Sequence, residues 1–193
     1  MEKKLKNIGF AITGSFCTHQ TILEEIKNLK AKGYNIFPIL SEISATTDTR
    51  FGKAENFIKD LTTITGNAPL SNIVCVEPTG PQNLFDIIVV APCTGNTLAK
   101  IANGINDTAI TMAVKAHIRN NKPVVVGIST NDGLGLNMKN VATLMSSKNF
   151  YLVPFGQDEF EKKPKSLVAD WSQIEKTMQL AMIGEQIQPI LLK

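Results

Sequence analysis

The sequence predicts an α/β protein: a doubly wound, mostly parallel sheet of the Rossmann or flavodoxin type, with helices on both faces. Short apolar runs alternate along the chain with longer amphipathic runs, which is the pattern of βα units. The run from Ile87 to Ala91 is apolar at every position, as expected of a central strand that is covered on both faces. The 193 residues suffice for one domain, 1–193, that buries a core without a metal or a disulfide.

The first half of the chain predicts three strands and two helices. The strands are expected at 7–13, 35–40 and 72–76, and the helices at 21–33 and 53–66. Thr21 and Glu24 have the spacing of a capping box, and Gly33 supplies a left-handed stop for the first helix. Pro38 has no N–H for the ladder, so the second strand should lie at an edge. The stretch 77–84 is rich in proline and glycine and is not expected to be helical.

The second half continues the alternation. Strands are expected at 86–91, 123–129 and 150–155, the last strand of the chain, and helices across 95–121, 137–148 and 167–187. The polar stretch 156–166 is interpreted as a solvated connection between the last strand and the closing helix. No repeat or long linker divides the chain, which supports a single domain.

Composition excludes several classes of protein. The 20 basic and 17 acidic residues give a formal net charge of +3, too balanced for a nucleic-acid partner. No apolar run approaches the roughly 20 residues that a membrane-spanning helix requires, and the N-terminal segment is interpreted as the first strand of a cytoplasmic protein. Cys17, Cys75 and Cys93 are widely spaced and form no C-x-x-C pair, so neither a disulfide framework nor a metal site is expected.

Four loops follow the carboxyl ends of the expected strands, where open parallel sheets bind ligands. These loops are 13–19, 41–50, 91–97 and 129–137. The first contains a lone glycine, Gly14, in place of G-x-G-x-x-G, so a NAD site in this chain is not expected. Ser15 and Ser41 are the hydroxyls expected on a phosphate; the alternative for Ser15 and Thr18 is that they only cap the first helix.

The loop 91–97 has two interpretations. It could be an ordinary turn from a strand to a helix, with Thr94 or Asn96 as the N-cap. Alternatively, its small residues let a flat ligand approach the backbone, and the Asn96 amide both donates and accepts at the edge of a heterocycle. We expect the second.

Arg50 and His19 are the candidate catalytic residues. The Arg50 guanidinium suits a carboxylate-bearing substrate, and its alternative is an ion pair with Asp48. His19 lies in the first loop and is a candidate for acid–base work, whereas His117 is expected to complement a helix end or lie on the surface.

Three further side chains have a structural explanation that we prefer to a chemical one. Cys93 and Cys17 are expected to be buried small hydrophobic residues rather than nucleophiles. Asp132 could act as a base, but an Asp-Gly pair is first of all a turn former.

The block "APCTGNTLAKIANGINDTAIT" (91–111) resembles the flavoprotein family of cysteine decarboxylases, doubly wound α/β domains that bind FMN at this loop. The resemblance implies flavin contacts from three loops, and Ser129, which opens the fourth loop, is assigned to the same site. The implied cofactor residues are Gly14, Ser15, Ser41, Thr94, Asn96, Thr97 and Ser129. The histidine that the decarboxylases carry is absent here, so cysteine decarboxylation is not expected.

Longer stretches, including "TGSFCTHQ", "TDTRFG" and "LMSSKNFYLVPFGQD", are similar to one branch of this family, a subunit of a synthase of sporulating bacteria. The resemblance implies an enzyme of the mother-cell cytoplasm that acts with a separate A subunit. Together they would oxidise a dihydro-ring dicarboxylate to pyridine-2,6-dicarboxylate, with NAD(P) on the A subunit. Arg50, and secondarily Lys100 or Arg119, would hold the carboxylates. The resemblance also implies a homo-oligomer.

Two alternatives remain open. The chain could be a non-catalytic partner that organises the A subunit, or a free-standing FMN-dependent decarboxylase.

Overall fold

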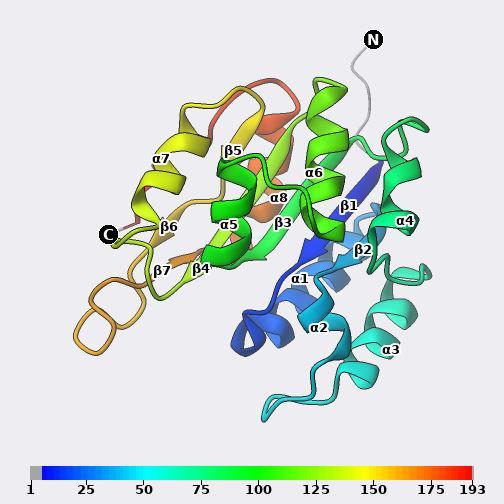
Figure 1. The fold of residues 1–193 in the computed structure, drawn as a ribbon, viewed down its shortest axis with the longest axis horizontal. Coiled ribbons are helices and arrows are strands. Elements are labelled where there is room, and N and C mark those ends of the chain that lie inside the picture. Colours follow the sequence, from blue (N-terminus) through cyan, green and yellow to red (C-terminus); the bar gives the residue numbers. More distant parts are fainter. Residues whose placement is uncertain (1–5, 193) are drawn as a thin grey trace.

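The computed structural model describes residues 6–192, in which helices flank a central sheet (Figure 1). The strands are β1 (Asn7–Ile12), β2 (Asn35–Leu40), β3 (Ile87–Cys93), β4 (Val124–Thr130), β5 (Phe150–Leu152), β6 (Phe155–Gly156) and β7 (Leu167–Ala169). The α-helices are α1 (His19–Ala31), α2 (Glu42–Thr46), α3 (Ala54–Thr65), α4 (Ile73–Val76), α5 (Gly95–Ala102), α6 (Ala109–Arg119), α7 (Met138–Met145) and α8 (Ile174–Ala181). Short 3₁₀ turns are η1 (Phe16–Thr18), η2 (Glu77–Thr79) and η3 (Trp171–Gln173).

The sheet has the order β2-β1-β3-β4-β7-β6, and β5 also pairs with β4. The pairs among β2, β1, β3, β4 and β5 are parallel, whereas β7 runs antiparallel to both β4 and β6. The predictions that β2 lies at an edge and that β3 is central are confirmed. The strand order reverses between β1 and β3, which is where doubly wound sheets open a crevice for ligands.

The core lies on both faces of the sheet because β3 and the first six residues of β4 are buried throughout. Figure 1 shows α4, α5, α6 and α7 on the near face. On the far face α1 packs against α3, and η3 packs against both α1 and α8. A strand covered on both sides is apolar at every position, which is the pattern that Ile87 to Ala91 shows in the sequence.

The prediction of a strand at 72–76 is wrong, because these residues form the helical turn α4. Asn72 caps it, with the Cys75 N–H donating to Asn72 Oδ1 at 2.9 Å. Val76 is buried while Val74 is 82% exposed, so only one side of this apolar run faces the core. The expectation that 77–84 is not helical is also wrong at its start, where η2 continues from α4.

The predicted capping box of the first helix is wrong as well. Helix α1 begins at His19 with Thr18 as its N-cap, so Thr21 lies inside the helix. The left-handed stop is confirmed, since Gly33 has a φ of 89°.

The C-terminal region differs from the prediction in two places. The expected strand 150–155 is split into β5 and β6 at Val153 and Pro154, and Leu167–Ala169 is strand β7 rather than the start of the closing helix. The helical turns begin only after Asp170, whose carboxylate accepts the Ser172 N–H at 3.1 Å. Across residues 6–192, none of the helices has the length and apolar character needed to cross a membrane.

Candidate functional site

The loops that follow β1, β3 and β4 meet at one edge of the sheet. Ser15 follows β1 and Ser129 lies in the last part of β4, yet their hydroxyl oxygens are 2.8 Å apart. Each hydroxyl has two lone pairs and one proton, so each retains capacity for a further hydrogen bond. We call the polar residues at this edge (Ser15, Ser129, Thr94, Asn96 and Thr97) the rim.

Thr13, which no sequence pattern singles out, ties the loops of the rim together. Its side chain is 1% exposed; Oγ1 donates to the Pro92 carbonyl at 2.6 Å and accepts the Thr94 N–H at 2.9 Å. The Thr13 N–H also donates to the Pro92 carbonyl, at 3.3 Å. The loop after β1 and the loop after β3 therefore hold a fixed relative position.

Helix α5 presents its N-terminus at the rim. Thr94 is the N-cap, in an extended conformation, but its hydroxyl donates to Thr97 Oγ1 at 3.4 Å and does not cap the backbone. Asn96 is exposed, and among residues 6–192 its amide has no hydrogen-bond partner. Unsatisfied N–H groups and the positive end of the helix dipole favour an anion at such a terminus.

The small residues of these loops also have packing explanations. A Cβ on Gly95 would lie 2.5 Å from Asn137 Nδ2, and a Cβ on Gly14 would lie 2.8 Å from the Ile43 side chain. Gly95 therefore lets the loop after β4 approach α5, and Gly14 lets α2 approach the loop after β1.

Ser41 caps α2. Its Oγ accepts the Ser44 N–H at 3.4 Å and lies 2.9 Å from the Ser44 hydroxyl. The Ser41 N–H donates to the Ile12 carbonyl at 3.1 Å, which keeps the loop after β2 beside the end of β1. Its assignment to a phosphate stays a prediction.

His19 is packed between aromatic rings at the start of α1. Its Nε2 donates to the Thr13 carbonyl at 2.9 Å, and its ring stacks on Phe57 with centroids 4.4 Å apart. Burial lowers the pKa of His19, because the charged imidazolium would lose its hydration. The acid–base role of His19 stays a prediction, and this geometry does not favour it.

Arg50 is exposed in the loop between α2 and α3. Its guanidinium lies 4.9 Å from the centroid of the Phe51 ring, and within residues 6–192 it forms no ion pair. The alternative pairing with Asp48 is therefore wrong in this structure; the Asp48 carboxylate instead accepts the Ala54 N–H at 2.9 Å. The guanidinium N–H groups remain open to a ligand.

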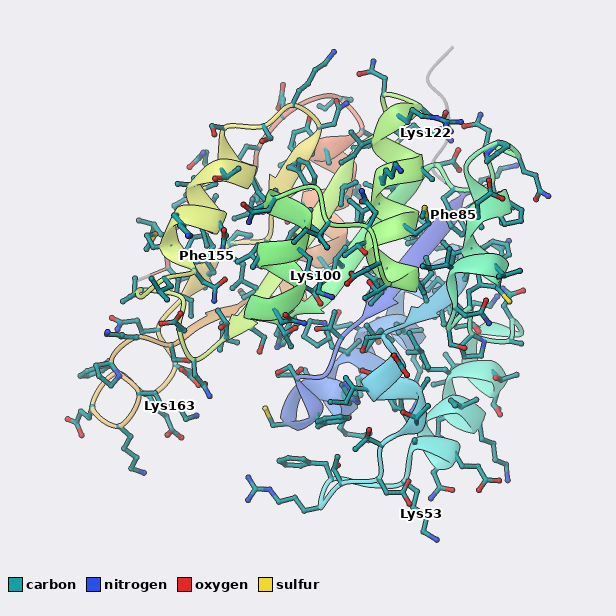
Figure 2. All side chains as sticks on the ribbon, in the orientation of Figure 1. Lys53, Phe85, Lys100, Lys122, Phe155 and Lys163 are labelled. Atoms are coloured by element: carbon teal, nitrogen blue, oxygen red, sulfur yellow. The ribbon has the colours of Figure 1, made fainter. Side chains whose placement is uncertain are left out.

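A cavity of about 270 Å³ lies beside the rim, between η1 and α1 on one side and α2 and α3 on the other. Its lining comprises Phe16, Cys17, His19, Gln20, Leu23, Ser44, Thr47, Thr49, Phe51, Gly52, Lys53, Ala54, Asn56, Phe57 and Asp60. Neither Asn96 nor Ser129 belongs to this lining. Figure 2 shows Lys53 at the lower edge of the molecule, at the end where α3 lies, and Lys163 on the separate projection between β6 and β7.

The two cysteines that were expected to be buried differ. Cys93 is fully buried, which confirms the prediction, and burial raises the pKa of its thiol far above the usual range, so it is no nucleophile. Cys17 is exposed, with its sulfur 3.8 Å from Ser15 Oγ, so the prediction of a buried Cys17 is wrong. The reason is that Cys17 lies in η1, a turn in which no residue is buried.

The remaining candidates lie away from the rim or are engaged. Arg119 ends α6, a helix that leads into the amino end of β4, so it lies at the opposite edge of the sheet. Lys100 pairs with Asp107 at 2.8 Å, which lowers the pKa of that carboxyl. His117 is buried, with Nε2 3.1 Å from the Pro123 carbonyl, so the expected surface position is wrong.

Asp132 forms a turn, as its Asp-Gly pair predicts. Its carbonyl accepts the N–H groups of Gly135 and Asn137 at 3.1 and 3.3 Å. Across the described residues, His, Cys, Asp and Glu side chains form no group of three that could hold a metal ion.

Comparison with known proteins identifies the class. Residues 1–179 match the Flavoprotein family, and the chain belongs to it. The structure resembles that of the FMN-dependent cysteine decarboxylase SpaF with a TM-score of 0.67; at 18% identity, over 91% of this chain and 97% of the other, this likeness concerns the fold.

Within the family, the chain is similar to one kind of synthase component. It is 44% identical over 190 residues to the B subunit of dipicolinate synthase from Bacillus subtilis (strain 168), covering 98% of this chain and 95% of the relative. The crystal structure of the corresponding B subunit from Bacillus halodurans C superposes with a TM-score of 0.89 at 43% identity, covering 97% and 96% of the two chains. The resemblance and the fold class expected from the sequence are confirmed.

Proposed function

We propose that this chain is the flavin-binding component of a dipicolinate synthase, which acts with a separate A subunit to oxidise a dihydrodipicolinate-type precursor to dipicolinate. The similarity to the B subunit of that synthase over nearly the whole chain supports this proposal. The observation that carries it is the rim: hydroxyls from three loops and an unpartnered amide gather at the point where the strand order reverses.

The donor set of the rim fits a phosphorylated, flat cofactor such as FMN. Ser15, Ser129 and the N-terminal amides of α5 suit the phosphate, and the Asn96 amide suits the edge of the heterocycle. Gly14, Ser41, Thr94 and Thr97 complete the proposed set. Bound FMN would supply a two-electron acceptor beside the substrate.

The oxidation removes a hydride and a proton from the dihydro ring, and NAD(P)⁺ takes up the hydride equivalent as NAD(P)H. This chain lacks the glycine fingerprint of a dinucleotide site, so we place NAD(P) on the A subunit. Arg50 then holds a ring carboxylate through its paired N–H groups, which fixes the orientation of the ring. Lys100 and Arg119 are no longer proposed for this role, since one is paired and the other lies at the opposite edge.

The test mixes the purified chain with an A subunit and follows dipicolinate formation. We expect Asn96→Ala to weaken FMN binding, and Arg50→Ala to raise the KM for the precursor by about tenfold or more, as loss of a charge-assisted hydrogen bond does. Arg119→Ala is the matched control, because it removes the same charge at the far edge. If Asn96→Ala and Arg50→Ala both behaved as the parent does, the active crevice would lie elsewhere.

A partner role without flavin is the second candidate function. It is favoured by the cavity, whose lining lies to one side of the rim and includes neither Asn96 nor Ser129. A colourless preparation that takes up no FMN, yet restores dipicolinate formation to the A subunit, supports this second function. Activity on a cysteinyl substrate without the A subunit would instead indicate a free-standing decarboxylase. The homo-oligomer and the mother-cell location stay predictions.

A further inference from the structure

The cavity of about 270 Å³ between α1 and α3 contains no residue of the rim in its lining, but it lies next to the rim. The turn η1 separates the two, because Ser15, which precedes it, faces Ser129 across the rim while Phe16 lines the cavity. At α2 the Ser44 hydroxyl lines the cavity and lies 2.9 Å from the hydroxyl of Ser41, whose N–H donates to the Ile12 carbonyl at the end of β1. A molecule in the cavity would therefore sit next to one held at the rim.

One wall of the cavity is aromatic. His19 and Phe57 stack with an interplanar angle of 15°, and Phe16 packs against His19 with ring centroids 5.1 Å apart. Since burial lowers the pKa of His19, this ring is neutral near pH 7 and presents an uncharged face. Leu23 adds apolar surface beside it. Aromatic and apolar walls with a few polar groups are typical of sites for flat organic ligands.

The residues that α3 and its N-cap contribute to the lining carry opposite charges at the two ends of the cavity. Lys53, Asn56, Phe57 and Asp60 recur at helical spacing and all line the cavity. Lys53 and Asp60 are separated by seven residues, or roughly 10 Å along a helix axis, so the cation and the anion mark opposite ends. In the part of the chain that the structure describes, neither side chain forms an ion pair. Arg50 lies close by, with its guanidinium 4.9 Å from the centroid of the Phe51 ring, which lines the cavity. This end therefore carries two cationic side chains, Lys53 and Arg50, against one carboxylate, that of Asp48, which accepts the Ala54 N–H.

We propose that this cavity is the compartment for the ring substrate, distinct from the rim that holds the phosphate. The flat ring lies against the wall of Phe16, His19 and Phe57, and a ring carboxylate points toward Lys53 and Arg50. Asp60 disfavours a carboxylate at the far end, so the carboxylate-bearing edge of the ring faces the Lys53 end. This inference rests on the proposed function, and it names Lys53 as a determinant of specificity for a carboxylate.

Titration of the purified chain with pyridine-2,6-dicarboxylate, followed by calorimetry, tests the compartment. We expect Lys53→Gln to weaken binding by about tenfold, the effect of losing one charge-assisted contact. Lys53 is the N-cap of α3 but makes no side-chain capping bond, so this substitution leaves the helix intact. The neutral pyridine-2,6-dicarboxamide should bind far more weakly than the dicarboxylate.

Two control variants on the same helix keep the result specific. Lys59→Gln removes the same charge from a residue outside the lining and should leave the affinity unchanged. Asp60→Asn removes a carboxylate from the lining and should raise the affinity. Equal weakening by Lys53→Gln and Lys59→Gln would reduce the effect to net charge and overturn the compartment.

A parallel titration with FMN separates this inference from the proposed function. We expect Asn96→Ala to weaken FMN without changing the affinity for the dicarboxylate, and Lys53→Gln to do the reverse. A chain that binds FMN but no dicarboxylate overturns the compartment and leaves the flavin role standing. A chain that binds the dicarboxylate through Lys53 but never takes up FMN supports the compartment and contradicts the flavin role.

Discussion

Thr13 is enclosed at the end of β1, where its hydroxyl both donates and accepts a hydrogen bond. The Pro92 carbonyl and the Thr94 N–H that it satisfies belong to the end of β3 and to the N-cap of α5. The Thr13 carbonyl in turn accepts the ring N–H of His19 and the Ser15 N–H, at 2.9 and 2.8 Å. One residue thus sets the position of α5, of the Ser15 hydroxyl and of the aromatic wall.

Replacing Thr13 by valine keeps the shape and removes the hydroxyl. We expect Thr13→Val to lower the free energy of unfolding by about 1–3 kcal/mol, because the Thr94 N–H loses its acceptor and the Pro92 carbonyl keeps only the longer bond from the Thr13 N–H. FMN binding should weaken as well, since α5 is no longer held against β1. Denaturant unfolding and FMN titration measure the two effects.

Thr13→Ser is the matched control, because it restores the hydroxyl and removes only a methyl group. It should recover most of the FMN affinity. A Thr13→Val protein with unchanged FMN affinity would show that the rim does not depend on this hydrogen bond.

At the scale of the elements, helix α6 packs beside α5 and begins with a capping box. Thr108 Oγ1 accepts the Thr111 N–H at 3.2 Å, and the Thr111 hydroxyl accepts the Thr108 N–H at 3.1 Å. We expect Thr108→Ala to lower the free energy of unfolding by about 0.5–2 kcal/mol, the usual effect of losing an N-cap. Thr108→Asn, which keeps an acceptor at the cap, should lose much less. Thermal or urea unfolding of both variants decides; equal losses would contradict the capping role.

The elements that could be predicted from the sequence are those with long, continuous signals. Strands β1 to β4 are six or seven residues long, mostly apolar and bounded by polar loops, and helices α1 and α3 carry a clear apolar stripe. Short runs are ambiguous: Ile73–Val76 is apolar, but only one side of it is buried, which a helical turn satisfies. Strand β7 has the burial alternation of a strand, since Leu167 and Ala169 are buried and Val168 is not, but all three residues are apolar and the sequence shows no alternation there.

Only part of the candidate site could be predicted from the sequence, because only part of it is fixed by the order of the strong strands. Ser15, Asn96 and Ser129 follow or end strong strands, so the topology of a parallel sheet places them at one edge. The cavity depends instead on how α1 packs against α3, which brings together Phe16 and Phe57, two residues that are roughly a fifth of the chain apart in sequence. No local pattern specifies that packing, and so Lys53 was not found.

For the whole molecule, His19 couples stability to pH because it joins β1, α1 and α3 through one neutral ring. Its pKa in the folded protein is lowered from the ordinary value of 6.5, with burial as the main cause. As the pH falls through 6.5, the unfolded chain takes up a proton at this position and the folded protein does not. The contribution of neutral His19 to stability is therefore fully present above 6.5 and declines as the pH falls from there toward the lowered pKa.

His19→Phe tests this coupling, because phenylalanine keeps a ring against Phe57 and cannot titrate. The difference in unfolding free energy between the parent and His19→Phe should be constant above about pH 7 and should move against the parent as the pH falls below 6.5. Urea unfolding across this range measures it, and the contributions of the other titratable groups, the partly buried Glu25 among them, cancel because both proteins carry them. An NMR titration of the His19 ring in the parent gives a second, independent reading. A difference that is flat with pH, together with a His19 ring that titrates at its ordinary value, would mean that water reaches this ring. The aromatic wall of the cavity would then be hydrated, which contradicts its proposed role as an uncharged surface for the ring substrate.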